Sequence, residues 1–139
     1  MTTFTPSKIN NNNLKIRAMK QITKEIKKFK LTNETFELNG LTLHRIQALV
    51  DFSNVKAGDL GGWVEREENL SQLDNAWVYD NAKVFGSAKI FGNAKVGGNA
   101  MVFGKPKVYD NAIVTGNAIV TGNAWVGGNK RVSGKSIIL

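Results

Sequence analysis

Cysteine is absent from this 139-residue sequence, and histidine occurs once, at His44. The first absence excludes disulfides, thiolate nucleophiles and cysteine-ligated zinc. The second excludes a site built from several imidazoles of one chain. No stretch approaches the roughly 20 apolar residues of a membrane-spanning helix, and the polar N-terminus has no apolar signal region. We expect a cytoplasmic protein with no membrane partner and no cofactor.

Acidic residues are also scarce. There are 11 Asp and Glu against 19 Lys and Arg, which gives a formal net charge of +8. Residues 1–30 hold eight of the bases and one acid, and residues 75–139 hold eight bases and two acids. The junction 61–74 reverses the sign, with one base and four acids. A basic excess of this kind favours anionic partners such as nucleic acid, a ribonucleoprotein or an acidic protein surface.

What the chain does contain is a six-residue repeat. From residue 75 it divides without insertion into ten blocks: NAWVYD, NAKVFG, SAKIFG, NAKVGG, NAMVFG, KPKVYD, NAIVTG, NAIVTG, NAWVGG and NKRVSG. The fourth position is Val in nine blocks and Ile in one, and the first, second and last positions are Asn, Ala and Gly in eight blocks each. A fixed short period indicates a solenoid, in which each coil buries its apolar face against its neighbours.

A unit with one β-branched and one small residue fits a short strand followed by a tight turn. Val or Ile points inward, and Asn and Gly occupy the turn, where positive φ is often required. Three units make a triangular coil of about 18 residues, and coils stack about 4.8 Å apart through parallel hydrogen bonds. Three inward rows follow: Val78/Val96/Val114/Val132, Val84/Val102/Val120/Ile138 and Ile90/Val108/Val126.

These Val-x-Gly-Asn-Ala-x blocks resemble the hexapeptide repeats of left-handed parallel β-helix proteins, many of which are trimeric acyltransferases. The segments LHRIQAL (43–49) and KAGDLGGWV (56–64), followed by the repeats, are similar to a group of uncharacterised bacterial and phage proteins. This closer resemblance covers about residues 30–139. The resemblance implies a mainly β fold, a left-handed parallel β-helix, in a bacterial host cell. The residues before the repeats are expected to add an N-terminal helix and a β-hairpin cap. The residue after Val is often Phe, Tyr or Thr, where acyltransferase repeats commonly have Gly.

Residues 31–68 are predicted to form the cap and lead-in, and residues 69–139 the solenoid. Asn39-Gly40 between alternating apolar residues predicts a hairpin over 35–46, which would cover the strand edge of the first coil. Four lead-in residues are expected in the interior: Trp63, Val64, Leu70 and Leu73. The apolar residues at 137–139 are expected to lie against a partner subunit.

Residues 1–30 are predicted to form a polar tail and a basic amphipathic helix over 14–30. The apolar residues Met19, Ile22, Ile26 and Phe29 recur at helical spacing and share one face. Lysines lie mostly elsewhere on its surface. This segment is either a solvated helix docked by its apolar stripe or a basic arm that contacts nucleic acid or an acidic protein surface.

The outward positions of the coils bring basic and aromatic residues together. Spacing by 18 puts Phe91 and Tyr109 on the face that carries Lys89 and Lys107. Such a face suits nucleic acid, because Lys meets phosphate and rings stack on bases. The alternatives are ladder packing between coils and, favoured here, a subunit interface that buries the aromatic rows. The candidate binding residues are Lys20, Lys24, Lys27, Lys28, Lys83, Lys89, Lys107, Phe91 and Tyr109. The candidate oligomer interface is Phe85, Phe103, Ile137, Ile138 and Leu139.

No catalytic or metal-binding residue is expected. Hexapeptide-repeat acyltransferases commonly use a histidine as general base, and the coils of this chain contain none. His44 lies in the hairpin and is interpreted as structural. Asp80 and Asp110 replace Gly at the turn position and are interpreted as turn residues rather than a carboxylate pair.

Two functions therefore stay open. The first is a non-enzymatic binding protein, a rigid solenoid dimer or trimer that engages an anionic or a protein partner. The phage-like resemblance makes one version attractive, an inhibitor of a bacterial defence nuclease such as a CRISPR effector. The second is an acyltransferase-like enzyme with a site between subunits.

Overall fold

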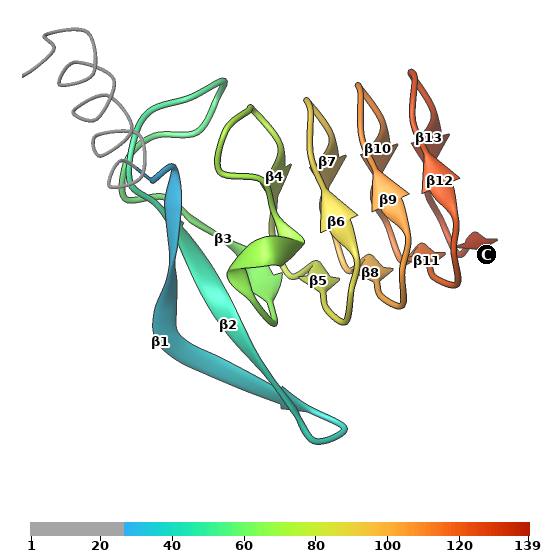
Figure 1. The fold of residues 1–139 in the computed structure, drawn as a ribbon, viewed down its shortest axis with the longest axis horizontal. Helices are drawn as coiled ribbons and strands as arrows, with labels where there is room; N and C mark the ends of the chain where they lie inside the picture. The colour runs from blue at the N-terminus through green and yellow to red at the C-terminus, as the bar shows by residue number, and fades with distance from the viewer. Residues whose placement is uncertain (1–26) are drawn as a thin grey trace, which may run out of the picture.

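A computed structural model describes residues 27–139 of the chain, as a hairpin followed by a row of stacked coils (Figure 1). The first elements are β1 (Phe29–Leu38), β2 (Leu41–Ala48), β3 (Leu60–Val64) and the 3₁₀ turn η2 (Glu67–Asn69). The repeats then supply two-residue strands: β4 (Trp77–Val78), β5 (Lys83–Val84), β6 (Lys89–Ile90), β7 (Lys95–Val96), β8 (Met101–Val102), β9 (Lys107–Val108), β10 (Ile113–Val114), β11 (Ile119–Val120), β12 (Trp125–Val126), β13 (Arg131–Val132) and β14 (Ile137–Ile138).

The repeats build three sheets, which confirms a three-sided coil of 18 residues. Each short strand pairs in parallel with the strand three units later, as Val78 with Val96 and Val96 with Val114. The sheet orders are β4-β7-β10-β13, β6-β9-β12 and β1-β2-β3-β5-β8-β11-β14. The hairpin thus continues one side of the solenoid, whereas the other two sides consist only of coil strands.

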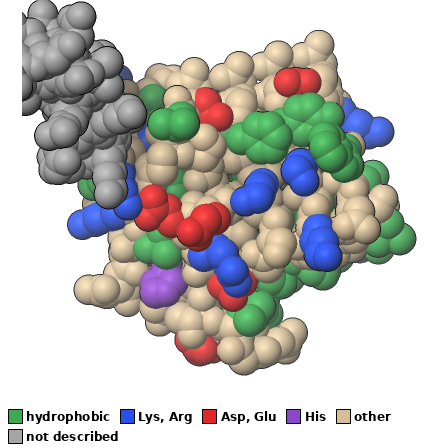
Figure 2. All heavy atoms as spheres, in the orientation of Figure 1, with side chains coloured by type: hydrophobic (Ala, Val, Ile, Leu, Met, Phe, Trp, Pro, Cys, Tyr) green, Lys and Arg blue, Asp and Glu red, His purple; other side chains and the backbone are tan. Residues whose placement is uncertain are grey.

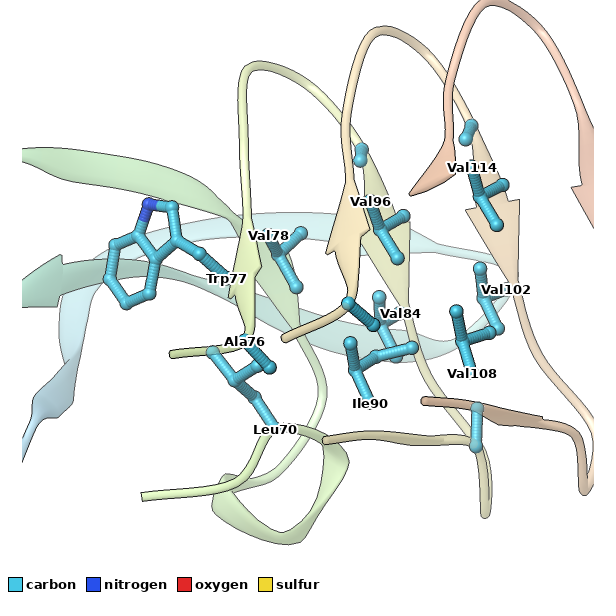
Figure 3. Packing of buried hydrophobic residues seen from close by; sticks show 14 of the residues in the cluster. Leu70, Ala76, Trp77, Val78, Val84, Ile90, Val96, Val102, Val108 and Val114 are labelled. Carbon is cyan, nitrogen blue, oxygen red and sulfur yellow. The ribbon is translucent and has the colours of Figure 1, made fainter. Parts of the chain in front are cut away.

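The three inward rows form the core, as predicted. Every Val or Ile of these rows is buried except Ile138 in the last strand, which is partly buried. Figure 3 shows Val78, Val96 and Val114 in one row and Ile90 beside Val108 in another. Burying one such side chain stabilises the fold by roughly 1.5–3 kcal/mol relative to its exposed state.

The turn position of all ten blocks has positive φ. Gly occupies it in eight blocks, and Asp80 (φ 56°) and Asp110 (φ 54°) occupy it in the other two. Asp and Asn are among the few residues with a side chain that adopt this region. Both carboxylates also bond to the next coil, where the Gly98 N–H donates to Asp80 Oδ2 at 3.1 Å and the Gly128 N–H to Asp110 Oδ2 at 3.0 Å. The interpretation of these two residues as turn residues is therefore confirmed.

The first coil is two residues longer than the others. Val64 pairs with Val84, 20 positions later, whereas Val78 pairs with Val96, 18 positions later. The two extra residues lie between Leu70, which bridges to Ile90, and Trp77. Trp63, Val64 and Leu70 are buried, as expected. The expectation for Leu73 is wrong: it lies in the insertion and is 85% exposed.

The predicted hairpin is confirmed and is longer than 35–46. Strands β1 and β2 pair antiparallel around Asn39 (φ 50°) and Gly40 (φ 85°), the signature of a two-residue turn. Strand β2 pairs antiparallel with β3, which pairs in parallel with β5. The hairpin thus covers the strand edge of the first coil on this side of the solenoid.

The predicted helix over 14–30 lies mostly outside the described residues. The prediction is wrong for its last four residues: Lys27 and Lys28 are not helical, and Phe29 and Lys30 belong to strand β1. The Phe29 ring is fully buried and meets the Trp77 ring edge-on, with ring centroids 6.1 Å apart. Tertiary packing against the first coil therefore determines the conformation here. In the described part of the chain, no helix has the length and apolar character to cross a membrane.

Candidate functional site

The outer surface of the sheet β6-β9-β12 brings together four of the candidate binding residues. Lys89, Lys107 and Trp125 lie in register on consecutive coils. The rings of Phe91 and Tyr109 stack beside them, with centroids 5.4 Å apart and an interplanar angle of 11°. These five residues define the aromatic–basic face. Figure 2 shows hydrophobic and basic side chains gathered over these strands.

Trp125 belongs to this face but is not among the binding residues predicted from the sequence. It is 65% exposed, its ring meets Tyr109 edge-on at 5.9 Å, and Lys107 Nζ lies 5.0 Å from the centroid of its ring. Its position 18 residues after Lys107 was the signal that could have identified it. Because Phe91 and Tyr109 stack on each other, Trp125 is the most exposed aromatic ring of the face.

Gly127 makes room for Tyr109. A Cβ on Gly127 would overlap the Tyr109 ring, and the backbone of Gly127 does not have positive φ. Glycine at this position therefore serves close approach rather than a turn. It lets Tyr109 lean along the coils toward Trp125.

The two lysines of the aromatic–basic face form no direct ion pair. Within residues 27–139, neither Lys89 nor Lys107 forms an ion pair. The only acids of residues 75–139 are Asp80 and Asp110, whose carboxylates accept backbone hydrogen bonds. On the first coil, Glu67 and Glu68 line one hollow together with Lys89. A positive surface results, which can attract an anion from solution.

Of the four candidate lysines near the N-terminus, two lie in the described residues and two, Lys20 and Lys24, lie outside them. Lys27 forms an exposed ion pair with Glu67 at 2.9 Å. Lys28 is 5% exposed, and its ammonium donates to the carbonyl oxygens of Asp74 (2.8 Å) and Ala76 (2.6 Å). Burial lowers the pKa of Lys28 to about 8, although Asp74 acts in the opposite direction. Lys28 is thus a residue of the core, contrary to the expectation that it contacts an external anion.

Lys83 lies on a different side of the solenoid from Lys89 and Lys107. It belongs to β5, in the long sheet, where its ammonium lies 4.9 Å from the centroid of the Phe36 ring of the hairpin. It also donates to the carbonyl oxygen of Asn81 at 3.2 Å. The structure therefore does not bring Lys83 together with the other two coil lysines.

The residues predicted for the oligomer interface gather on the long sheet. Phe85 and Phe103 stack with centroids 5.0 Å apart, and Ile137 and Leu139 are 63% and 79% exposed. Ile138 instead continues an inward row. Met101 and Ile119 occupy outward positions between these groups, because side chains alternate along a strand. We call Phe85, Met101, Phe103, Ile119 and Ile137 the apolar face.

His44 lies in β2, and its Nδ1 is 3.0 Å from the carbonyl oxygen of Thr32 across the hairpin. Among residues 27–139, no group of three or more His, Cys, Asp or Glu side chains is placed to hold a metal ion. The arrangement offers cations, amides and aromatic rings, which bind ligands by charge, hydrogen bonds and stacking.

Comparison with known proteins agrees with the fold. A family model described as YdcK Beta solenoid repeat matches residues 107–120. The coils are β-solenoid repeats. The chain is also similar to the uncharacterized acetyltransferase YdcK of Escherichia coli (strain K12), with 49% identity over 37 residues. This similarity covers 27% of the chain and only 11% of that relative.

Proposed function

We propose that this protein is a non-enzymatic binding module, and that its aromatic–basic face holds an anionic partner, a nucleic acid or a ribonucleoprotein. The observation that carries the proposal is the register of Lys89 and Lys107 beside the exposed Trp125. Two ammonium groups on consecutive coils can each meet a phosphate. An exposed indole can stack on a base.

The charge of the coils supports a polyanion rather than a neutral partner. Residues 75–139 hold eight Lys and Arg and two Asp, a net charge of +6 (8 − 2). Acidic Glu67 and Glu68 lie at the start of the solenoid, in η2. The partner is therefore expected to contact the later coils, around Lys107 and Trp125, because residues 93–139 contain one acid, Asp110, which accepts the Gly128 N–H.

The finer features of the proposal come from the resemblance to hexapeptide-repeat proteins. It favours left-handed coils, an exception to the usual right-handed crossover. A dimer or trimer would form through the apolar face. The phage-like resemblance favours an inhibitor of a bacterial defence nuclease, such as a CRISPR effector, in the cytoplasm of a bacterial host.

A salt series tests the proposal. The probe is a short single-stranded oligonucleotide, DNA or RNA, titrated at several salt concentrations. For single strands, each phosphate contact contributes about 0.7 to the slope of log affinity against log salt. Lys89→Gln/Lys107→Gln is therefore expected to lower the slope by about 1.4. Trp125→Ala is expected to cost about 1–3 kcal/mol of binding free energy.

The matched control is Lys95→Gln/Arg131→Gln, which removes the same charge from the sheet β4-β7-β10-β13. It should leave most of the affinity and slope intact. Equal losses in the two double variants would mean that binding is diffuse. Absence of binding at low salt by the unaltered protein would refute the anionic partner.

A second candidate function is acyl transfer, which the similarity to the uncharacterized acetyltransferase favours. The matched 37 residues are a small part of that protein, and the coils supply no histidine. A catalytic base would have to come from His44 or another group. The test follows thiol release from an acyl thioester with amine and alcohol acceptors, in the unaltered protein and in His44→Ala. Turnover that His44→Ala abolishes would replace the binding proposal, whereas turnover unchanged in this variant would exclude a His44 mechanism.

A further inference from the structure

The outer surface of the sheet β4-β7-β10-β13 carries a groove that the proposed function does not use. Its wall is the loop over residues 49–59. This loop is anchored because the Phe52 ring packs edge-on against Trp77, with centroids 5.2 Å apart. Tyr79 Oη also donates a 3.0 Å hydrogen bond to Asn54 Oδ1. The wall is thus held against the first regular coil.

Two hollows flank Lys95 in the floor of this groove. One, of about 370 Å³, lies toward Ser53 and a row of asparagines. The other, of about 220 Å³, lies toward Tyr79 and Gly97. Lys95 and Ile113 line both hollows, so the two hollows meet at these residues. The larger hollow is near the lower end of the range for small-ligand pockets, about 300–1,000 Å³, and the smaller one is below it.

A ladder of amides lines the larger hollow. Asn75 Nδ2 donates to Asn93 Oδ1 at 3.4 Å, and Asn93 Nδ2 donates to Asn111 Oδ1 at 3.3 Å. A side-chain amide has two N–H groups and two acceptor sites. Each amide of the ladder can therefore form further hydrogen bonds, both as donor and as acceptor. Hydroxyl groups both donate and accept. The ladder therefore matches a ligand that presents hydroxyl groups at regular intervals along the solenoid.

Gly97 lines the smaller hollow and puts no side chain into it. A Cβ there would lie 3.4 Å from Tyr79 Cβ and 3.6 Å from Asp80 Oδ2, which are ordinary contact distances. The φ of Gly97 is not positive, so the backbone does not require glycine. The missing side chain leaves open space beside Lys95 that a larger residue would fill.

Lys95 supplies the single positive charge of the groove. Within residues 27–139 it forms no ion pair, and the carboxylate of the neighbouring Asp80 is bonded to the Gly98 N–H. Asp80, which lines the smaller hollow, is the single carboxylate of the groove, so a negative ligand group would pair with Lys95 from the larger hollow. One cation among the neutral polar groups of that hollow suits a ligand with isolated negative charges. A polyphosphate chain would need more cations than this groove offers.

We propose that this groove binds an acidic oligosaccharide, in which Lys95 pairs with a carboxylate of the sugar chain and Asn75, Asn93 and Asn111 bind ring hydroxyls. A repetitive ligand fits the repetitive ladder, because one amide recurs on each coil. The aliphatic side chain of Ile113 offers an apolar contact for a sugar ring at the junction of the hollows.

Calorimetric titration tests this site. The acidic probe is an oligosaccharide of galacturonic acid, and the neutral probe is a glucose oligosaccharide of equal length. The acidic probe should bind saturably, and the neutral probe at least about tenfold more weakly. Lys95→Gln should weaken binding of the acidic probe about tenfold or more. Gly97→Val, whose side chain would occupy the smaller hollow, should do the same.

The matched control is Lys107→Gln, the same substitution on the aromatic–basic face, which should leave binding of the acidic probe unchanged. Because this variant weakens only oligonucleotide binding, failure here is distinguishable from failure of the proposed function. Should Gly97→Val not fold, Lys95→Gln alone decides. Absence of saturable binding, equal affinity for the two probes, or full affinity in Lys95→Gln would each overturn the proposal.

Discussion

The ammonium group of Lys28 donates a 2.6 Å hydrogen bond to the carbonyl oxygen of Ala76, at the start of the first regular coil. It donates a second, of 2.8 Å, to the carbonyl oxygen of Asp74, whose carboxylate lies 3.7 Å away. One buried cation thus joins the beginning of β1 to residues 46 and 48 positions later in the chain. It acts together with the contact between the Phe29 and Trp77 rings, which joins the same two parts of the chain.

The first prediction concerns the pH dependence of stability. Burial lowers the pKa of Lys28 to about 8 from an ordinary value of 10.5. Between these values the folded protein has released a proton that the unfolded chain retains, so Lys28 should raise the stability as pH increases from 8 to 10.5. Below pH 8 Lys28 is charged in both states and contributes no pH dependence. Urea midpoints measured from about pH 7 to 10 check this.

The comparison variant for that measurement is Lys28→Met, which removes the titrating group. Above about pH 8, the urea midpoint of the unaltered protein should rise relative to the midpoint of this variant. Burial, and then Asp80, raise the pKa of Tyr79, so this residue lowers stability as pH rises above about 10. Measurements in a Tyr79→Phe background separate the two effects. Parallel curves for the unaltered protein and the Lys28→Met variant would contradict the first prediction.

The second prediction concerns Gln72, in the two-residue insertion of the first coil. Its Oε1 accepts from the backbone N–H groups of Lys28 (2.8 Å) and Phe29 (3.1 Å), and its Nε2 donates to the carbonyl oxygen of Phe29 at 3.1 Å. Gln72→Ala leaves these backbone groups without that partner, at a cost of about 1–3 kcal/mol for each group that stays dry. Hydrogen exchange at the Phe29 amide should accelerate more than exchange in the later coils.

The control for Gln72→Ala is Leu73→Ala in the same insertion. Leu73 is almost fully exposed, so its truncation should change stability by less than about 0.5 kcal/mol. A similar loss of stability in both variants would contradict the prediction. It would mean that any change in the insertion is destabilising, and that the hydrogen bonds of Gln72 to β1 are not the cause.

The sequence predicted the coils and the hairpin well, because the evidence for both is local and repeated. Each inward Val recurs at the same place in a six-residue unit, and Asn39-Gly40 encodes its own turn. The insertion before residue 75 has no such signature, so Leu73 was placed in the interior. Phe29 fits both helical spacing and a strand, and its contact with Trp77 decides between them. The charge of Lys28 gave no indication of its distant carbonyl partners.

For the candidate site, the sequence could predict only which residues lie next to one another. Spacing by 18 correctly put Phe91 and Tyr109 next to Lys89 and Lys107. It could not show that the two rings stack on each other, since ring orientation depends on the space around them. That space comes from Gly127, which a sequence pattern treats as one more turn-forming residue.

The third prediction tests that space. In Gly127→Ala the new Cβ would overlap the ring of Tyr109, so the ring must move. We expect a loss of up to about 1 kcal/mol in the free energy of unfolding, because the atoms in the way are the far end of a partly exposed side chain that can move. Urea denaturation measures this loss, and a changed near-ultraviolet circular dichroism signal from Tyr109 and Trp125 should accompany it.

A double-mutant cycle identifies the clash as the cause. In a Tyr109→Ala background the same change at residue 127 meets no ring, and replacing Gly by Ala there should be neutral or stabilise by about 0.4–1 kcal/mol. An unchanged loss in this background would attribute the effect to the backbone of residue 127 instead of to Tyr109.

The fourth prediction concerns the apolar face, Phe85, Met101, Phe103, Ile119 and Ile137. Lys83 is the one charged residue among the outward positions of β5, β8, β11 and β14, and its ammonium lies over Phe36. A contiguous apolar surface without free charge is typical of a protein–protein contact. We therefore expect the protein to self-associate through this face.

Light scattering during size-exclusion chromatography should accordingly give the mass of a dimer or trimer, not the 15.2 kDa of one chain. Ile119→Lys puts a charge in the middle of the apolar face, which would be buried without a partner in the assembly and should convert it to monomers. Ile113→Lys is the matched control, because it makes the same change on the sheet β4-β7-β10-β13 and should leave the mass unchanged. A monomeric unaltered protein at high concentration, or equal dissociation in both variants, would contradict this interface. The stacked Phe85 and Phe103 would then stabilise only the contact between coils.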